Sequence, residues 1–408
     1  MELRKKILQI NTVINSGSTG RIAEDIGLLA INRGWESYIA FGRNNRFSKS
    51  NKIKIGSSAS IYFHVLLSRL FDRHGFGSKV ATRKLIKKID ILKPDIIHLH
   101  NIHGYYINIE LLFNYLKKAN IHVVWTLHDC WAMTGHCTHF MSVNCNKWKT
   151  NCNTCPLKNE YPASLYFDQS NKNFFQKKGL FTRVESMTLV PVSDWLGGVV
   201  KESYLNKYPI VRIYNGIDLD LFFPRNVECL RKKIGVENKT VILGVASVWD
   251  KRKGLADFLR LSDLLKADEV VILVGVSQKI INTLPENIIG IRKTERAKEL
   301  SDFYSLADVY LNLTWEDNFP TTNLESLACG TPVITYKTGG SPESITSDTG
   351  FVVDQGDLLS VRKSIDMIKS KSKAYYTNNC RNRAMYFYDK DTQFEHYFNL
   401  YKRLLEGG

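Results

Sequence analysis

Apolar runs of strand length alternate with stretches of helical periodicity along most of the chain. In the first half, the runs typical of buried strands cover residues 6–11, 37–42, 95–100, 123–128 and 188–193. In the second half they cover residues 240–247, 269–276, 288–292 and 308–313. Strands that alternate with helices predict parallel sheets of the α/β class. Because the pattern begins again near residue 240, we expect two Rossmann-like lobes.

The first strand runs into a glycine-rich turn, which a helix with one apolar face follows. Gly17, Ser18, Thr19 and Gly20 occupy this turn. A strand-to-helix turn with little side-chain bulk can bring its backbone close to a ligand. Such turns are common, so this one is a weak signal by itself.

Residues 315–334, WEDNFPTTNLESLACGTPVI, combine acidic side chains with the start of a helix. Glu316 and Asp317 follow the strand at 308–313, and Glu325 lies on the helix that Thr321 and Thr322 open. A helix N-terminus favours a phosphate group, because its N–H groups are unpaired and its dipole is positive there. Carboxylates suit sugar hydroxyls. The stretch therefore predicts a nucleotide-sugar site, and an ordinary strand–helix corner with solvated acids is the alternative.

This stretch resembles the acid–seven residues–acid motif of retaining glycosyltransferases of family 4, which have the GT-B fold. Asp317 and Glu325 have the motif's spacing, and ESLACGTPVI matches the helix and strand that follow it. The resemblance covers nearly the whole chain. Within the family, the chain resembles enzymes of colanic-acid, capsule and exopolysaccharide biosynthesis. Asp317 stands where the family usually has Glu, so either Glu316 or Asp317 can take the first acid role.

The resemblance implies transfer of a hexose from a UDP- or GDP-linked donor to a hydroxyl of a glycan or lipid-linked acceptor, with retention of configuration. It implies a catalytic His128 and an acceptor-side loop at residues 17–20. It also implies that no cofactor is needed for catalysis. Ser247 aligns with the family's usual arginine, which leaves Lys253 as the phosphate clamp. The implied donor-binding residues are Ser247, Arg252, Lys253, Asn318, Phe319, Thr321, Thr322 and Glu325.

We expect residues 1–205 to form an acceptor-binding lobe with a cysteine-rich insertion at 130–155, and residues 206–385 to form the nucleotide-sugar lobe. Residues 386–408 should form a C-terminal helix that packs back on the first lobe. The spacing Thr392-x-x-Glu395 is typical of a capping box at the start of that helix.

The insertion holds Cys137, Cys145, Cys152 and Cys155, with the spacing C-x7-C-x6-C-x2-C. In a chain without a recognisable signal peptide, this pattern favours a metal over disulfides. Four thiolates suit a tetrahedral structural zinc, with His136 and His139 as alternate ligands. Free thiols in a loop are the alternative reading.

The net charge of +16 is concentrated in the first half. Residues 1–200 contain 27 lysines and arginines against 13 acids. A basic lobe indicates an anionic partner, such as a membrane surface or a lipid-linked phosphate. A helix expected at 58–72 could lie in a membrane interface or pack on the lobe core. No apolar run is long enough to span a membrane, so we expect a cytoplasmic protein, peripheral on the inner face of the membrane.

Two other functions fit parts of the pattern. A basic nucleic-acid-binding protein would match the charge and the cysteines, but the densest basic stretch carries no standard nucleic-acid motif, so we expect no nucleic-acid partner. A sugar-nucleotide epimerase on the same fold would need no acceptor.

Overall fold

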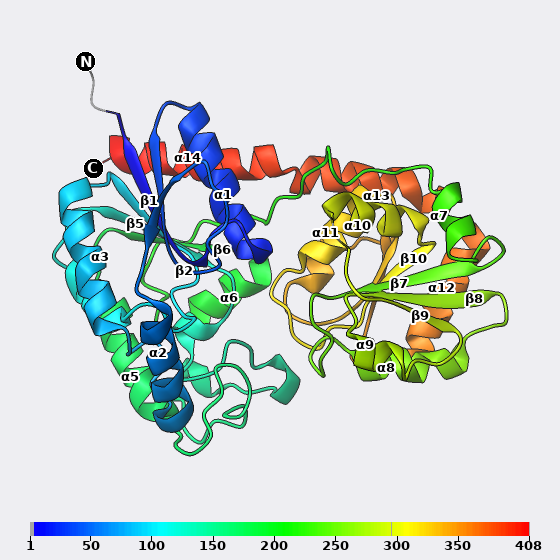
Figure 1. The fold of residues 1–408 in the computed structure, drawn as a ribbon, viewed down its shortest axis with the longest axis horizontal. Helices are drawn as coiled ribbons and strands as arrows, with labels where there is room; N and C mark the ends of the chain where they lie inside the picture. The colour runs from blue at the N-terminus through cyan, green and yellow to red at the C-terminus, as the bar shows by residue number, and fades with distance from the viewer. Residues whose placement is uncertain (1–3, 295, 408) are drawn as a thin grey trace. The chain divides into compact units, whose positions relative to one another are not determined.

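The computed structural model describes residues 4–294 and 296–407, which divide into two compact units (Figure 1). Unit 1 comprises Met1–Tyr214 and Phe394–Gly408, and unit 2 comprises Asn215–Gln393. The sequence placed these boundaries after residues 205 and 385. The structure thus assigns the segment up to Tyr214 to unit 1 and the segment up to Gln393 to unit 2.

Unit 1 is built on a six-stranded parallel sheet with the strand order β3-β2-β1-β4-β5-β6. Its strands are β1 Lys6–Val13, β2 Glu36–Arg43, β3 Asn51–Lys54, β4 Ile96–Leu99, β5 His122–Leu127 and β6 Met187–Pro191. Its helices are α1 Gly17–Asn32, α2 Ser58–Phe71, α3 Lys79–Leu92, α4 Ile109–Leu116, α5 Ser170–Phe181 and α6 Asp194–Glu202. The central strands β4 and β5 are almost entirely buried, as expected for a parallel sheet covered on both faces.

Unit 2 repeats this architecture with the order β12-β11-β10-β7-β8-β9. Its strands are β7 Thr240–Val245, β8 Glu269–Val274, β9 Ile288–Ile291, β10 Val309–Asn312, β11 Val333–Tyr336 and β12 Gly350–Val353. Its helices are α7 Glu228–Lys233, α8 Leu255–Leu261, α9 Gln278–Ile281, α10 Ala297–Leu306, α11 Thr321–Ala328, α12 Leu358–Lys371 and α13 Lys373–Tyr388.

Both sheets have the doubly wound strand order of a Rossmann fold. In unit 1 the order reverses between β1 and β4, and in unit 2 it reverses between β7 and β10. Loops leave the carboxyl ends of the two central strands in opposite directions at such a point, which opens a crevice for ligands. The two-lobed α/β fold predicted from the sequence is therefore confirmed, and the switch point of each sheet marks where ligand-binding residues should gather.

The last helix, α14 Lys390–Glu406, contributes its C-terminal part to the core of unit 1 (Figure 1). Phe394, Tyr397, Phe398 and Tyr401 pack in one buried cluster with residues of the unit 1 sheet, such as Ile96. The hydroxyl of Tyr397 also accepts a hydrogen bond of 3.1 Å from Thr126 Oγ1 on β5. The predicted packing of the C-terminal helix on the first lobe rests on these apolar side chains.

The predicted capping box at Thr392 is wrong. α14 begins at Lys390, so Thr392 lies inside its first turn. The Asp389 carboxylate accepts hydrogen bonds from the Thr392 backbone N–H at 3.0 Å and from its hydroxyl at 2.8 Å. The side chain before the helix satisfies these donors, as an N-cap does.

A search of the described helices for a segment both long and apolar enough to cross a bilayer finds none.

Candidate functional site

In unit 2, the corner that follows β7 meets the loop that follows β10, one on each side of the sheet's switch point. The backbone N–H of Trp315 donates to the carbonyl of Arg252 at 2.8 Å. The Arg252 guanidinium in turn donates to the carbonyl of Glu316 at 3.1 Å. These contacts fix the basic corner against the acidic loop, although more than 60 residues separate them in the chain.

Gly254 allows this close approach. Its φ of +74° lies in the left-handed region, and a Cβ placed there would stand 2.1 Å from the Leu313 carbonyl oxygen. Any other residue would therefore push the corner away from the end of β10. The glycine also caps the N-terminus of α8.

Lys253 and Asp317 form an ion pair in this corner. Lys253 Nζ lies 2.9 Å from Asp317 Oδ2, and each side chain is 21% exposed. Glu316, the neighbouring acid, is buried. The predicted phosphate clamp and one of the two predicted first acids are thus brought into direct contact.

Asp257 was not anticipated from the sequence. Its buried carboxylate accepts from the Trp315 indole N–H at 2.8 Å and from the Tyr336 hydroxyl at 3.0 Å. The carboxylate therefore holds Trp315, the residue that precedes the two acids. An aspartate in the first turn of a short helix gives no sequence signal of this role, because its partners come from β11 and the loop after β10.

The N-terminus of α11 follows the acidic loop. Thr321 and Thr322 are its first residues, and Pro320 before them supplies no side-chain cap. Asn318 and Phe319 are buried, and the carbonyl of Asn318 accepts from the Gly340 N–H at 3.1 Å. The helix start is thus held in place by neighbouring segments and keeps the positive dipole end that favours phosphate.

A buried amide network, missed by the sequence analysis, supports this helix start. The Asn323 side chain accepts from Asn312 Nδ2 at 2.8 Å and donates to Ser341 Oγ and Ser344 Oγ, each at 3.0 Å. It joins β10, α11 and the 3₁₀ turn Ser341–Ser344. Because every hydrogen bond lies in the interior, the network fixes the position of α11.

Glu325 lies one turn further along α11, and its buried carboxylate accepts from the Tyr304 hydroxyl at 2.8 Å. Burial and the Glu325 charge raise the pKa of Tyr304 well above its usual value, so the phenol remains a donor. Ser247, in contrast, lies exposed beyond the end of β7.

In unit 1, His128 follows β5 and is joined to His100, which follows β4. His100 Nδ1 lies 3.2 Å from His128 Nε2, and His100 Nε2 lies 3.0 Å from Gln9 Oε1. Gln9 donates its Nε2 to the Ala23 carbonyl at 2.7 Å, so its Oε1 accepts from His100. A neutral His100 then accepts at Nδ1, and the proton of a neutral His128 resides on Nε2.

Both imidazoles are neutral near pH 7. Burial lowers the pKa of His128 to about 4, and the charge of Asp129 only partly opposes this. Burial and the neighbouring histidines lower the pKa of His100 well below its usual range. The chain of hydrogen bonds therefore leaves the basic lone pair of His128 on Nδ1. In the sequence His100 is only the last residue of a strand-like run, and only the parallel pairing of the strands reveals its contact with His128.

Asp129 pairs with His103. Their Oδ2 and Nε2 atoms are 2.6 Å apart, and Asp129 Oδ1 accepts from the Trp131 N–H at 2.9 Å. Burial alone would raise the pKa of Asp129, but His103 and these hydrogen bonds lower it to about 2. His103 Nδ1 lies 3.2 Å from the Tyr161 hydroxyl. A cavity of about 10 Å³ is lined by His100, His103, His128 and Asp129 among others.

Residues 17–20 form the first turn of α1, at the carboxyl end of β1. Gly17 has a φ of +63°, and its surroundings are open. Ser18 is exposed, while Thr19 Oγ1 lies 3.5 Å from Asn11 Nδ2. Gly20 is buried, and a Cβ there would stand 3.0 Å from the Val13 side chain. The predicted acceptor-side loop thus lies beside the switch point of its own sheet.

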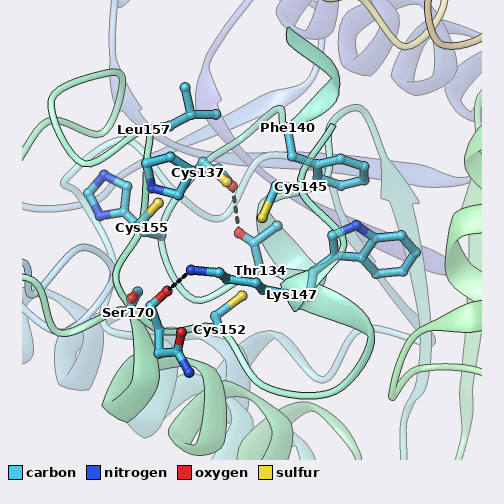
Figure 2. Close-up of a pocket in the computed structure, with 13 residues that line it drawn as sticks. Thr134, Cys137, Phe140, Cys145, Lys147, Cys152, Cys155, Leu157 and Ser170 are labelled. Atoms are coloured by element: carbon cyan, nitrogen blue, oxygen red, sulfur yellow. Dashed lines mark hydrogen bonds between the residues drawn. The ribbon is translucent and has the colours of Figure 1, made fainter. Parts of the chain in front are cut away.

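The four predicted metal ligands also come together. Cys137, Cys145, Cys152 and Cys155 line one pocket, which Figure 2 shows with their sulfur atoms turned toward a common space. Cys130 is buried outside this set.

Comparison with known proteins bears on this arrangement. Residues 226–384 match the family described as Glycosyl transferases group 1. The whole chain is similar to the putative colanic acid biosynthesis glycosyl transferase WcaC of Escherichia coli, with 22% identity over 98% of this chain and 100% of the relative.

Among solved structures, the chain is similar to a sucrose-phosphate synthase from Thermosynechococcus elongatus, with a TM-score of 0.75, 15% identity and coverage of 99% and 100% of the two chains. It is also similar to Anabaena Alr3699/HepE in complex with UDP, with a TM-score of 0.68, 15% identity and coverage of 97% and 99%. Residues 226–384, which lie in unit 2, thus match a family of glycosyl transferases, and the whole chain has the two-lobed GT-B fold of these solved structures.

Proposed function

We propose that this protein transfers a hexose from a nucleotide-diphosphate sugar to a hydroxyl of a lipid-linked glycan in surface-polysaccharide synthesis, with retention of configuration. The observation that carries the proposal is the convergence of Lys253, Asp317 and the N-terminus of α11 at the unit 2 switch point. Two similar proteins agree with it: Anabaena Alr3699/HepE is known in complex with UDP-glucose, and WcaC of Escherichia coli is described as a colanic acid biosynthesis glycosyl transferase.

The donor diphosphate would bind between Lys253 and the N–H groups at Thr321 and Thr322. Negative charge grows on the leaving diphosphate in the transition state, and fixed positive groups stabilise it there. Arg252 already binds a backbone carbonyl, so Lys253 carries the larger share of this role. Because these groups offset the phosphate charge, we propose that transfer needs no divalent cation beside the donor, and activity should not rise when magnesium or manganese is added.

Glu325 would hold the ribose hydroxyls, and Asp317 would bind the sugar together with backbone groups of Asn318 and Phe319. We assign Asp317 rather than Glu316 to the sugar because the Asp317 carboxylate lies partly exposed beside Lys253, the proposed ligand of the diphosphate. In unit 1, His128 would be the catalytic histidine, in the neutral form that burial favours and with its Nε2 turned to His100. The loop at residues 17–20 would bind the acceptor.

Binding of nucleotides to the purified protein tests the donor half of the proposal. A melting shift with UDP or GDP that both Lys253→Ala and Glu325→Ala weaken would support it, and Leu359→Ala serves as a remote, exposed control. No shift with any nucleotide would refute it. Product analysis with and without a lipid-linked acceptor separates transfer from epimerisation, and the anomeric coupling of the product reports retention.

The acceptor side includes a helix that exposes its apolar side chains. Only His64 and Ser68 of α2 are buried, and both make polar contacts: His64 accepts from the N–H groups of Gly75 and Gly77 at 3.2 and 3.1 Å. On the same helix Tyr62, Phe63, Leu66 and Phe71 are between 44% and 74% exposed. An exposed apolar surface on a helix whose fully buried side chains are both polar indicates a partner for that surface.

A second segment extends this surface. Phe71 stacks on Phe167 with ring centroids 5.8 Å apart, and the Leu165 N–H donates to the Arg69 carbonyl at 2.7 Å. Leu165, Tyr166 and Phe167 are all more than half exposed. We name the seven residues Tyr62, Phe63, Leu66, Phe71, Leu165, Tyr166 and Phe167 the α2 apolar face.

We propose that the α2 apolar face enters the interface of an anionic bilayer, where the lipid-linked acceptor resides. The charge of the region supports this, because residues 43–88 contain twelve basic residues and one acid. Apolar insertion and attraction to anionic lipid together give stable peripheral binding.

Sedimentation with phosphatidylglycerol-containing vesicles tests the membrane part. The double variant Phe63→Ser, Leu66→Ser should lose at least tenfold in binding, and high salt should weaken the wild type. Leu359→Ser is the matched control, because Leu359 is 66% exposed in unit 2. Wild-type protein that stays in the supernatant at low salt, or a double variant that binds like wild type, would exclude this face as the docking surface.

A further inference from the structure

The cysteine-lined pocket lies in a segment that has little regular structure of its own. Between α5 and the 3₁₀ turn Trp131–Met133, the chain forms only two more 3₁₀ turns, Met141–Val143 and Lys147–Lys149. The cavity that the four cysteines line measures about 20 Å³, which is enough for about one water-sized particle. An irregular segment this long inside a compact unit needs some other source of order.

The four thiols share one pocket. The Cys137 thiol hydrogen-bonds Cys155, and Cys145 and Cys152 line the same cavity. All four are free thiols, so no disulfide crosslinks the segment. Figure 2 shows the four side chains arranged around the pocket, with Thr134 and Lys147 between them.

A buried histidine borders this cluster. His136 Nδ1 lies 2.6 Å from Asp72 Oδ1 across 64 residues of sequence, and its Nε2 is buried without a hydrogen-bond partner among the described residues. Asp72 Oδ2 accepts from the Gln169 N–H at 2.8 Å. The carboxylate therefore orients the ring, and its second nitrogen is left for a partner that the polypeptide does not supply.

A buried lysine, Lys177, also belongs to the surroundings of the cysteine cluster. Lys177 is 1% exposed, and its Nζ donates to the Trp131 carbonyl at 2.6 Å and lies 3.7 Å from the Trp131 ring centroid. Within residues 4–294 and 296–407, no carboxylate oxygen comes within 4.0 Å of this ammonium. The groups whose negative charge would stabilise this ammonium are Cys152 and Cys137, together with Asp129 and Asp72. A buried ammonium needs compensating negative charge, and thiolates at these cysteines would supply it.

We propose that Cys137, Cys145, Cys152 and Cys155 bind one structural zinc ion as thiolates, with Lys177 and His136 offsetting the charge of the cluster. Four thiolates around Zn²⁺ carry a net charge of about −2, which a buried cation stabilises. His136 Nε2 would donate a hydrogen bond to a zinc-bound sulfur. Soft thiolate ligands in a closed tetrahedral set favour zinc over magnesium or calcium.

The thiols must move for this site to form. As the side chains stand, no three His, Cys, Asp or Glu residues of the described segments form a group that could hold a metal ion. Rotation of short cysteine side chains in an irregular segment can supply this closure, as in other sites where metal binding and folding are coupled. Tyr161 belongs to the same segment, and its hydroxyl lies 3.2 Å from His103 Nδ1. A bound metal would therefore also fix the surroundings of the Asp129–His103 pair.

Metal analysis of the full-length protein tests the proposal without any activity measurement. We expect about one zinc per chain by elemental mass spectrometry, and four sulfur atoms at about 2.3 Å by zinc-edge X-ray absorption. Cys152→Ser should lose the metal, whereas Cys229→Ser, at an exposed cysteine of unit 2, should retain it. Lys177→Met should release zinc to a chelator about 10- to 100-fold faster than wild type.

Because Cys152→Ser could fail to fold, the wild type is also stripped with a chelator under reducing conditions and reloaded with zinc alone. Recovery of one zinc per chain supports the proposal. Less than about 0.1 zinc after reloading would refute it, as would a nitrogen- or oxygen-dominated shell, or a mass loss showing paired oxidised cysteines. Since no sugar, nucleotide or acceptor enters these measurements, failure here is distinct from failure of the proposed transfer reaction.

Discussion

The ion pair between Lys253 and Asp317 leads to a prediction in which two neighbouring substitutions act in opposite directions. At a separation of 2.9 Å, two unit charges attract by about 6 kcal/mol if the effective dielectric constant is about 20. Desolvation and side-chain ordering reduce the net value of such a partly exposed pair to about 1 kcal/mol. In the ligand-free protein a donor diphosphate must compete with Asp317 for Lys253.

Lys253→Ala should therefore weaken UDP binding by about 10- to 100-fold, because a hydrogen bond to a charged group contributes about 1.5–3 kcal/mol. Asp317→Asn should tighten binding of free UDP by about fivefold, since it removes the competing charge worth about 1 kcal/mol. The same variant should lose affinity for a UDP-hexose relative to UDP, because the sugar loses its carboxylate partner.

Isothermal titration calorimetry with UDP and UDP-glucose measures all three effects, and GDP is the parallel probe if UDP does not bind. Lys253→Arg is the matched control that keeps the charge, and it should bind at least several-fold better than Lys253→Ala. The reasoning is refuted if Asp317→Asn weakens the binding of UDP as much as Lys253→Ala does, because the ion pair would then only hold the two loops together.

Three further predictions concern the other side chains. His100→Leu should lower kcat at least tenfold and change the pH profile of kcat, because the tautomer of His128 is no longer fixed. The Kd for UDP should stay unchanged. A change in nucleotide affinity instead of kcat would argue against a positioning role for His100. Glu325→Gln should weaken UDP about tenfold in calorimetry, and dUMP should show a smaller loss if a ribose hydroxyl is the partner. Asp129→Asn should cost about 2 kcal/mol in urea unfolding at pH 7, because the pKa of Asp129 is about 2 in the folded protein and near 3.8 in the unfolded chain. A lowered acid pKa contributes stability that is present above pH 4 and is lost as the pH falls toward 2, so the difference between variant and wild type should vanish in that window.

The sequence pattern was most informative for elements in which the local conformation and the position in the fold require the same residue types. Apolar runs of five or six residues mark the buried strands such as β5 and β8, because a central parallel strand must be apolar on both faces. Gly254 and the acids after β10 could be predicted for a similar reason, since a tight corner and a helix start each restrict the residue types allowed. The C-terminal helix was expected, but its first residue was placed incorrectly because Asp389, outside the predicted box, caps it.

Other parts of the site depend on contacts between segments that are distant in the sequence, and the pattern of residues along the chain does not reveal such contacts. His100 and His128 meet only because β4 and β5 pair in parallel register, with Leu99 opposite Trp125. Asp257 reaches Trp315 only because α8 returns over the end of β10. The periodicity of α2 indicated an amphipathic helix but not which face is covered, and the structure buries its histidine and serine instead of its aromatic residues.

The sequence by itself determined the alternating strands and helices of the two lobes, the basic corner at Lys253, the acidic loop at Asp317 and the set of four cysteines. Each of these is a local property, in which neighbouring residues share one turn, one strand or one loop. The tertiary structure decided the pairing of Lys253 with Asp317, the orientation of His128 by His100, and the buried partners Asp72 and Lys177 around the thiols. Those contacts depend on how strands and helices pack, and the energy of a buried charge or hydrogen bond depends on every segment that surrounds it.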